Sequence, residues 1–292
     1  MMIPAFDYLR GYRQIQHEVE TAVRRVFSSG SLILGPEGEA FEREFAAYVG
    51  AREAVGVGSG TDAIVVALRA LDIGPGDEVI TVSHTAAATV GAVREVGAVP
   101  VLVDIDQRSL NIDPDGVEVR VGPRTRAILP VHLYGRPAAM QAIDSIAMRH
   151  GLAVVEDCAQ AHGARIAGRH VGTFGVVGCF SFYPTKNLGA FGDAGACVTG
   201  DPKLAERMRQ LRFHGFDERR SAQVEGINSR LDEIQAAILR VRLRHLQEWN
   251  EERRQAAARY ALLFREYGLQ EQVRPPVEAE GNTHIYHQYV IR

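Results

Sequence analysis

Lys186 stands out among the residues that could do chemistry, because this chain uses lysine so sparingly. Only two of its 33 basic residues are lysine, Lys186 and Lys203, and the others are arginine. An arginine guanidinium stays protonated, whereas a partly buried lysine amine can lose its proton and form an imine with a carbonyl. Lys203 follows Asp201-Pro202, a pattern typical of an exposed first helical turn. Lys186 follows an apolar run, so it is either a solvated loop residue or an imine-forming lysine.

Two further segments carry residues suited to a phosphate and to a basic ring nitrogen. Gly56-Val-Gly-Ser-Gly-Thr-Asp62 lies between an expected strand and an expected helix, where free backbone amides favour a phosphate. It is equally compatible with a structural turn, since it lacks the third glycine of a dinucleotide site and the P-loop lysine. Asp157 ends an expected strand, where it is either a ligand carboxylate or a helix cap. We expect His162, near the same edge, to be a hydrogen-bonded partner rather than a ligand.

Together these segments match the chemical groups of pyridoxal phosphate. That cofactor has a phosphate for the glycine-rich turn, a basic ring nitrogen for Asp157 and an aldehyde for Lys186. The agreement between three distant segments favours the functional interpretation of each one. The residues therefore predict a site for pyridoxal phosphate.

The periodicity of the chain predicts an α/β scaffold around this site. Short apolar runs alternate with amphipathic stretches over residues 54–157, which is typical of a mostly parallel, buried sheet with helices on both faces. Two more strands, over residues 179–183 and 194–199, are expected to flank the loop that holds Lys186. Lys186 is thus predicted to lie in a loop between two strands.

The last part of the chain has a different pattern. Residues 231–267 form an unusually long helical stretch, and residues 284–292 have the pattern of a strand. We interpret residues 1–245 as a large cofactor-binding domain. Residues 246–292 are interpreted as a connecting helix and the start of a small C-terminal α+β domain that is incomplete.

Composition and charge argue against several other classes of protein. The 292 residues are 46% hydrophobic with a formal net charge of -3, which gives no reason to expect nucleic acid or an anionic membrane as a partner. No apolar run approaches a membrane span and no signal peptide is evident, so we expect a cytoplasmic protein. Cys158, Cys179 and Cys197 lack metal-ligand spacing, so we expect small core residues and no metal site.

The ordered motifs of this chain resemble those of the DegT/DnrJ/EryC1/StrS family of pyridoxal-phosphate-dependent sugar aminotransferases, over nearly its whole length. The resemblance is carried by Gly30-Ser-Leu-Ile-Leu-Gly-Pro36, Gly58-Ser-Gly-Thr-Asp62, Pro130-Val-His-Leu-Tyr-Gly135, Glu156-Asp-Cys-Ala-Gln-Ala-His-Gly163, Ser181-Phe-Tyr-Pro-Thr-Lys-Asn-Leu-Gly189, Gly192-Asp-Ala-Gly195 and Asn228-Ser-Arg-Leu-Asp-Glu-Ile-Gln235. It implies fold type I of the pyridoxal-phosphate-dependent transferases. It also implies a homodimer whose active sites are shared between subunits.

By matching position, the resemblance implies a role for each site residue. Lys186 would form the imine with the cofactor and later move the proton between substrate and cofactor. Asp157 would pair with the ring nitrogen and keep it protonated, which makes the ring an electron sink. Further cofactor contacts are implied for Ser59, Gly60, Thr61 and Ser181 at the phosphate, for Gln160 at the ring or its hydroxyl oxygen, and for Asn228 of the partner subunit at the phosphate.

One position departs from the family pattern. Family members commonly stack an aromatic residue on the cofactor ring where this chain has Ala86. Either another side chain, such as His84, covers that face, or the ring is held less tightly. His132 and Tyr134, at a neighbouring strand end, are further candidates for the site.

The resemblance also implies a substrate class, with alternatives. The Lys186-Asn-Leu-Gly189 segment is similar to members that aminate the C3 keto group of nucleotide-linked deoxysugars, with L-glutamate as the implied amino donor. One alternative is a pyridoxal-phosphate-dependent keto-deoxysugar dehydratase, in which histidine replaces the lysine. Another is a non-catalytic regulatory protein that binds the cofactor, an interpretation that Ala86 slightly favours. A nicotinamide oxidoreductase is disfavoured by the incomplete glycine pattern.

Overall fold

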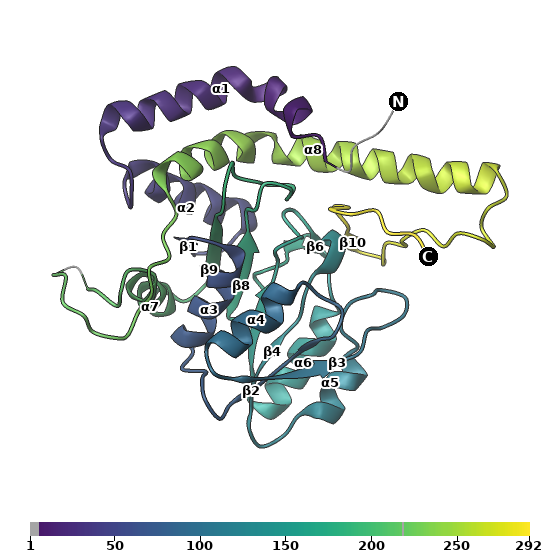
Figure 1. Ribbon diagram of the computed structural model, residues 1–292. Helices are drawn as coiled ribbons and strands as arrows, with labels where there is room; N and C mark the ends of the chain where they lie inside the picture. The colour runs from purple at the N-terminus through teal and green to yellow at the C-terminus, as the bar shows by residue number, and fades with distance from the viewer. Residues whose placement is uncertain (1–5, 218) are drawn as a thin grey trace.

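A seven-stranded, mostly parallel sheet forms the centre of the computed structural model, which describes residues 6–217 and 219–292 (Figure 1). The strand order is β1-β9-β8-β5-β4-β2-β3. Strand β9 runs antiparallel to both of its neighbours, and the other six strands share one direction. The strands are β1 (Glu53–Val57), β2 (Glu78–Val82), β3 (Val99–Val103), β4 (Thr125–Leu129), β5 (Ala153–Asp157), β8 (Val177–Ser181) and β9 (Gly195–Thr199). The expected α/β scaffold is confirmed.

Helices cover both faces of this sheet, which explains why its central strands are almost wholly apolar. On one face lie α3 (Gly60–Ala70), α4 (Ala87–Glu95) and α7 (Pro202–Arg212). On the other lie α2 (Pro36–Val49), α5 (Pro114–Arg120), α6 (Met140–His150) and α8 (Glu233–Glu266). Successive residues of β2, Val79 and Ile80, belong to hydrophobic clusters on opposite faces. Because these strands are buried on both faces, their residues form continuous apolar runs in the sequence.

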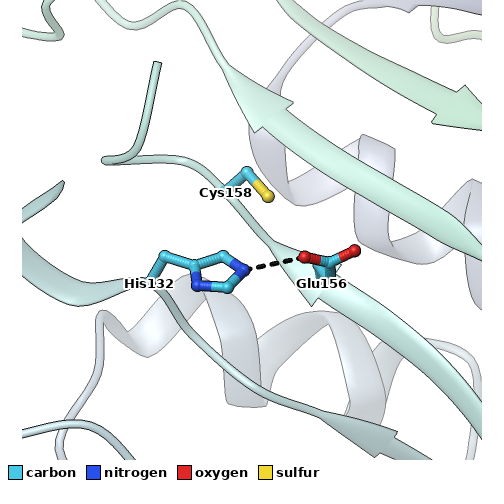
Figure 2. Close-up of side chains that lie close together, drawn as sticks. All are labelled: His132, Glu156 and Cys158. Carbon is cyan, nitrogen blue, oxygen red and sulfur yellow. Dashed lines mark hydrogen bonds and ion pairs between the residues drawn. The ribbon is translucent and has the colours of Figure 1, made fainter. Parts of the chain in front are cut away.

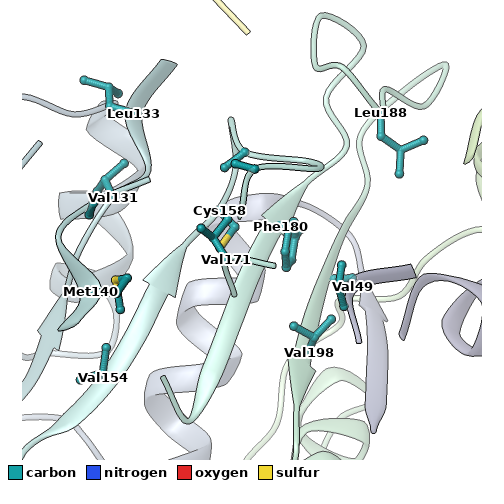
Figure 3. Packing of buried hydrophobic residues seen from close by; sticks show 14 of the residues in the cluster. Val49, Val131, Leu133, Met140, Val154, Cys158, Val171, Phe180, Leu188 and Val198 are labelled. Atoms are coloured by element: carbon teal, nitrogen blue, oxygen red, sulfur yellow. The ribbon is translucent and has the colours of Figure 1, made fainter. Parts of the chain in front are cut away.

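Aromatic rings fill the core beneath α2. Phe45 is fully buried, and its ring meets the rings of Phe180 and Phe182 edge to face, with centroids 5.0 and 5.2 Å apart. Such pairs stabilise a fold by roughly 0.5–1.5 kcal/mol each beyond the burial of their area. Figure 3 shows part of this cluster, including Phe180 on β8 and Val198 on β9. The two strands that flank the Lys186 loop are thus packed into this hydrophobic cluster.

The N-terminal helix α1 (Tyr8–Ser29) packs along α8. Its buried residues Ile15, Val19, Ala22 and Val26 form one stripe and meet the apolar side of α8 near Ile238. Helix α8 continues without a break across residue 245, where the sequence interpretation divides the chain. That division into two domains stays a prediction. Among the described residues, no helix is both long and apolar enough to cross a membrane.

The strand expected over residues 284–292 is wrong. The structure has only β10 (Asn282–Thr283) in that region, paired in a small antiparallel sheet with β6 (Arg165–Ile166), which pairs in turn with β7 (Arg169–His170). Residues after β10 make isolated backbone hydrogen bonds instead, from Ile285 N to Gly135 O and from Gln288 N to Tyr134 O. Ile285 is buried in the hydrophobic cluster under α2 and α6, so its apolar character reflects packing rather than strand pairing.

A buried carboxylate from α8 holds the start of α2. Glu233 is 1% exposed and accepts hydrogen bonds from the backbone N–H groups of Gly35, Glu37 and Gly38, at 2.8–2.9 Å. The first N–H groups of a helix lack partners within the helix and carry partial positive charge, so a carboxylate satisfies both needs. A Cβ at Gly38 would lie 2.8 Å from Glu233 Oε1, which explains glycine there.

We expect Glu233→Gln to destabilise the protein by about 2–3 kcal/mol, because the amide loses the charge and turns an NH₂ toward N–H donors. Urea unfolding followed by circular dichroism measures this change. Glu248→Gln, on the exposed side of the same helix, is the matched control and should leave the midpoint unchanged. Equal midpoints for the two variants would contradict the capping role.

Candidate active site

Asp157 and Lys186 reach the same edge of the sheet because β5 and β8 are neighbouring parallel strands. Asp157 ends β5 and pairs with Cys179 of β8. Strand β8 ends at Ser181, and Lys186 lies in the loop that leads to β9. The carboxyl ends of parallel strands meet at one edge, where ligands of α/β sheets bind. The reversed direction of β9 keeps the whole Lys186 loop at that edge.

The N-terminus of α3 lies at the same edge, at the carboxyl end of β1. Ser59 is its N-cap, and the Ser59 hydroxyl accepts a hydrogen bond from Asp62 N at 3.1 Å. A Cβ at Gly60 would lie 2.4 Å from Ser181 Cβ, so only glycine lets this helix start so close to the end of β8. The arrangement presents backbone N–H groups and hydroxyls together, which suits a phosphate.

These segments enclose one cavity of about 260 Å³. Of the predicted site residues, it is lined by Ser59, Gly60, Thr61, Ala86, Asp157, Ser181 and Lys186. Other lining residues are Ile64, Ala88, Thr89, Ala159, Tyr183, Asp193 and Ala194. The structure thus brings together the glycine-rich turn, the strand-end carboxylate and the lysine, although they are far apart in sequence.

Lys186 is the titratable base of this cavity. Burial lowers the pKa of its amine, and the negative charge of Asp157 opposes that effect by raising the pKa. A lowered pKa increases the fraction of neutral amine near neutral pH, and the neutral amine is the nucleophile. The environment of Lys186 therefore suits an imine-forming residue that also takes up and releases protons.

Asp157 is held by a threonine that the sequence interpretation missed. Its Oδ2 accepts a hydrogen bond from Thr89 Oγ1 at 2.8 Å, and its Oδ1 accepts one from Ala159 N at 3.0 Å. Because Thr89 gives its hydrogen to Asp157, the Thr85 hydroxyl, 2.8 Å away, must donate to Thr89. The i, i+4 spacing of the two threonines was the only signal in the sequence.

Gln160 and Asn228 do not line this cavity in the described part of the chain. Gln160 Oε1 accepts a hydrogen bond from Tyr134 N at 2.6 Å and supports the positive φ of 62° at Tyr134. Asn228 is exposed, and its backbone forms an isolated bridge with Phe213. Neither residue lines the cavity within a single chain, so the predicted cofactor contacts of Gln160 and Asn228 stay predictions.

The remaining candidate side chains lie outside the cavity. His84 Nε2 lies 2.8 Å from the hydroxyl of Tyr134, and neither residue is among those that line it. His162 packs against Phe180 and Phe182, and among the described residues neither of its ring nitrogens has a hydrogen-bond partner of good geometry. The expected hydrogen-bonded role of His162 is wrong. Burial, assisted by the charge of Lys186, lowers its pKa well below the ordinary value, so the ring is neutral.

His132 belongs to a buried cluster with Glu156 and Cys158 (Figure 2). His132 Nδ1 accepts a hydrogen bond from Ala138 N, so Nε2 carries the hydrogen and donates it to Glu156 at 3.0 Å. Both ring nitrogens are thus engaged, whereas a metal ligand needs a free lone pair. Glu156 also accepts hydrogen bonds from two glycine amides, at 2.7 Å each. Glu156 thus has a structural role: it connects His132 to the backbone of the two glycines, next to Asp157.

The fold and this cavity define a class of protein: an α/β transferase of fold type I, with a lysine in the loop after the last parallel strand and a carboxylate at a strand end. The chain belongs to the DegT/DnrJ/EryC1/StrS aminotransferase family, whose model matches residues 13–292. The expected family and fold class are confirmed.

Individual relatives are similar along the whole chain. A dTDP-3-amino-3,4,6-trideoxy-alpha-D-glucose transaminase of Streptomyces venezuelae is 51% identical, over 99% of this chain and 76% of its own length. A pleiotropic regulatory protein of Geobacillus stearothermophilus is 48% identical, over 100% of this chain and 78% of its own length. A crystal structure of DesV from S. venezuelae, in complex with a ketimine intermediate, superposes with a TM-score of 0.95 at 51% identity, over 99% of this chain and 77% of that one.

These comparisons establish an aminotransferase. Similarity to a named transaminase along the whole chain, with lysine at position 186, favours this activity over the dehydratase and over the non-catalytic regulator. Family membership implies the use of pyridoxal phosphate. The cavity suits that group, because it offers helix-start amides for a phosphate, Asp157 for a ring nitrogen and an amine for an aldehyde.

We expect Asp157→Asn to move the titration of the Lys186 amine to lower pH by roughly half a unit or more, since the variant removes the charge that raises the lysine pKa. The pH dependence of Lys186 acetylation by trace acetic anhydride, read by mass spectrometry without added cofactor, measures this shift. Acetylation of Lys203 in the same digest corrects for the reactivity of the reagent. An unchanged or upward-shifted profile would mean that the two groups do not interact across the cavity.

Proposed function

We propose that this protein transfers an amino group from L-glutamate to the C3 keto group of a nucleotide-linked deoxysugar, using pyridoxal phosphate. The observation that carries the proposal is the meeting of Lys186, Asp157 and the N-terminus of α3 around one cavity. Each of these three features matches one group of the cofactor: the helix start the phosphate, Asp157 the ring nitrogen and Lys186 the aldehyde. Bound there, the cofactor would supply an electron sink for the reacting carbon.

Each side chain of the cavity has a separate role in the proposed reaction. Lys186 would hold the cofactor and would serve as the base and acid that moves one proton, a role suited to its lowered pKa. Asp157, which Thr89 holds in place through a hydrogen bond, would keep the ring nitrogen protonated. Ser59, Gly60, Thr61 and Ser181 would bind the phosphate through amides and hydroxyls.

At Ala86, the proposed site lacks the aromatic residue that commonly covers the cofactor ring in the family. Ala86, at the start of α4, lines the cavity with only a methyl group. His84 is paired with Tyr134 and does not replace the missing aromatic ring. We therefore propose that the substrate or another chain covers this face. Gln160 would reach the ring oxygen with its NH₂ group while its carbonyl oxygen keeps the bond to Tyr134 N.

The assignment to C3 rests on two observations. The Lys186-Asn-Leu-Gly189 segment resembles that of 3-aminating members of the family. The S. venezuelae relative is named for a 3-amino product. Both support amination at C3 of a nucleotide-linked deoxysugar.

A homodimer with shared sites completes the proposal. Asn228 is exposed in its own chain, so its predicted phosphate contact would be made in the partner's site. The apolar side chains of Leu32, Ile33 and Leu34 are also 37–52% exposed, which supports an interface beside this region.

The test of turnover incubates the protein with pyridoxal phosphate, glutamate and nucleotide-linked keto-deoxysugars, with products read by mass. We expect amination of a 3-keto sugar at a rate at least about tenfold above that of the 4-keto isomer. Lys186→Ala should abolish transfer, and Lys203→Ala, which alters the only other lysine, should retain it. Borohydride reduction should fix the cofactor to Lys186. Label on Lys203, or transfer by Lys186→Ala, would overturn the assigned role.

Shared sites predict complementation between two inactive variants. Mixed dimers of Lys186→Ala and Asn228→Ala subunits would have both changes in one site and none in the other, so equal mixing after reversible dissociation should recover about a quarter of wild-type activity. If Asn228 served its own chain, neither site would be intact and no activity would return. The measurement is glutamate-dependent transfer before and after mixing.

A further inference from the structure

A buried amide network joins the residue after Lys186 to the long helix α8. Asn187 and Asn250 are 4% and 3% exposed, and Asn187 Nδ2 donates to Asn250 Oδ1 at 2.8 Å. The second hydrogen of Asn187 Nδ2 goes to Ile285 O at 3.2 Å. The Asn187 side chain thus links the lysine loop to two segments that follow it by 63 and 98 residues.

The acceptor side of Asn187 is also engaged. His287 Nδ1 lies 3.2 Å from Asn187 Oδ1, and since an amide oxygen can only accept, this nitrogen must carry the hydrogen. Burial, helped by the charges of Lys186 and Arg253, lowers the pKa of His287 to about 3, so its ring is neutral and donates from one nitrogen only. Every hydrogen of the Asn187 amide group is therefore committed, and its oxygen has a fixed donor.

Asn250 extends the network toward Asp157. Its Nδ2 donates to His162 O at 2.7 Å, in the segment that follows β5. Gly163 has a φ of 106°, and a Cβ there would lie 2.4 Å from Asn250 Nδ2. Glycine at this position lets the backbone after Asp157 approach the amide. One side chain of α8 thus contacts both the segment that follows Asp157 and the loop that carries Lys186.

We propose that Asn250 is a positioning residue for Lys186, acting through the side chain of Asn187. The inference rests on the proposed imine-forming role of Lys186. An amide that bridges two buried partners has one orientation that satisfies both, and losing it leaves the other groups unpaired. The part of the loop around Asn187 would then no longer be held by Asn250, while Phe191 N would keep its hydrogen bond to Gln235 of α8. The Lys186 amine, next to Asn187, would gain access to water.

Asn111 provides a matched control for a purely structural effect. It is 1% exposed, donates from Nδ2 to Arg136 O at 3.0 Å and accepts from Leu133 N at 3.1 Å. Asn111 and Asn250 are thus buried asparagines that each make one donor and one acceptor bond across distant segments. Only Asn250 is bonded to the residue beside Lys186.

The experiment compares Asn250→Ala and Asn111→Ala by the pH dependence of Lys186 acetylation, without added cofactor. Both variants should lower the unfolding midpoint by a similar amount. Only Asn250→Ala should raise the midpoint of Lys186 acetylation, by roughly half a pH unit or more, because burial is what lowers the pKa of this amine. The absorbance titration of the holoenzyme should show a change confined to the same variant.

Two results would overturn the proposal. One is an equal shift, or no shift, of the Lys186 profile in the two alanine variants. The other is a double variant, Asn187→Ala/Asn250→Ala, whose shift of the Lys186 acetylation midpoint equals the sum of the two single shifts. If Asn250 acts through Asn187, the double variant should shift that midpoint no more than Asn187→Ala alone. If Asn250→Ala does not fold, Asn250→Ser and Asn111→Ser carry the same comparison. A failure of borohydride labelling at Lys186 would refute the imine role separately, since acetylation requires no cofactor.

Discussion

The reversal of strand β9 is the constraint on which the site depends. Because β9 runs antiparallel to β8, the chain must turn back at the carboxyl edge of the sheet, and the turn holds Lys186 there. Strand β5 ends at the same edge with Asp157, as the parallel partner of β8. On its other side β9 pairs with β1, whose end leads into α3. Four strands from distant parts of the chain thus deliver the lysine, the carboxylate and the helix start to one place.

Buried polar side chains hold the connecting segments around this frame. Glu233 holds the start of α2, and Asn250 joins the lysine loop to the segment after Asp157. Glu156 links His132 to the backbone of Gly172 and Gly175, just before β8. Apolar packing is tolerant of small shifts, whereas a buried hydrogen bond is costly to leave unmade. These buried hydrogen bonds therefore fix the positions of the loops, while the packing of the aromatic core beneath α2 stabilises the fold as a whole.

The sequence interpretations that failed share one cause. The apolar residues of 284–292 have the alternation of a strand, but Ile285 is buried in the main hydrophobic cluster and its N–H donates to Gly135 O. His162 has the look of a polar partner at a strand end, yet its ring lies among phenylalanines. The spacing of Thr85 and Thr89 did not indicate that Thr89 bonds Asp157, which lies 68 residues further along the chain. In each case, the neighbour that decides the role is far away in the chain.

The sequence by itself determined the class of scaffold and the chemistry of the site. Periodicity identified the buried strands, because a strand that is buried on both faces has a continuous run of apolar residues. The rarity of lysine identified Lys186. Family motifs then linked these residues to a cofactor. Only the tertiary structure decided which side chains line the cavity, that Gln160 bonds Tyr134 N, and that Asn250 reaches the lysine loop. Such contacts depend on strand order and loop packing, which are properties of the whole chain rather than of any short segment.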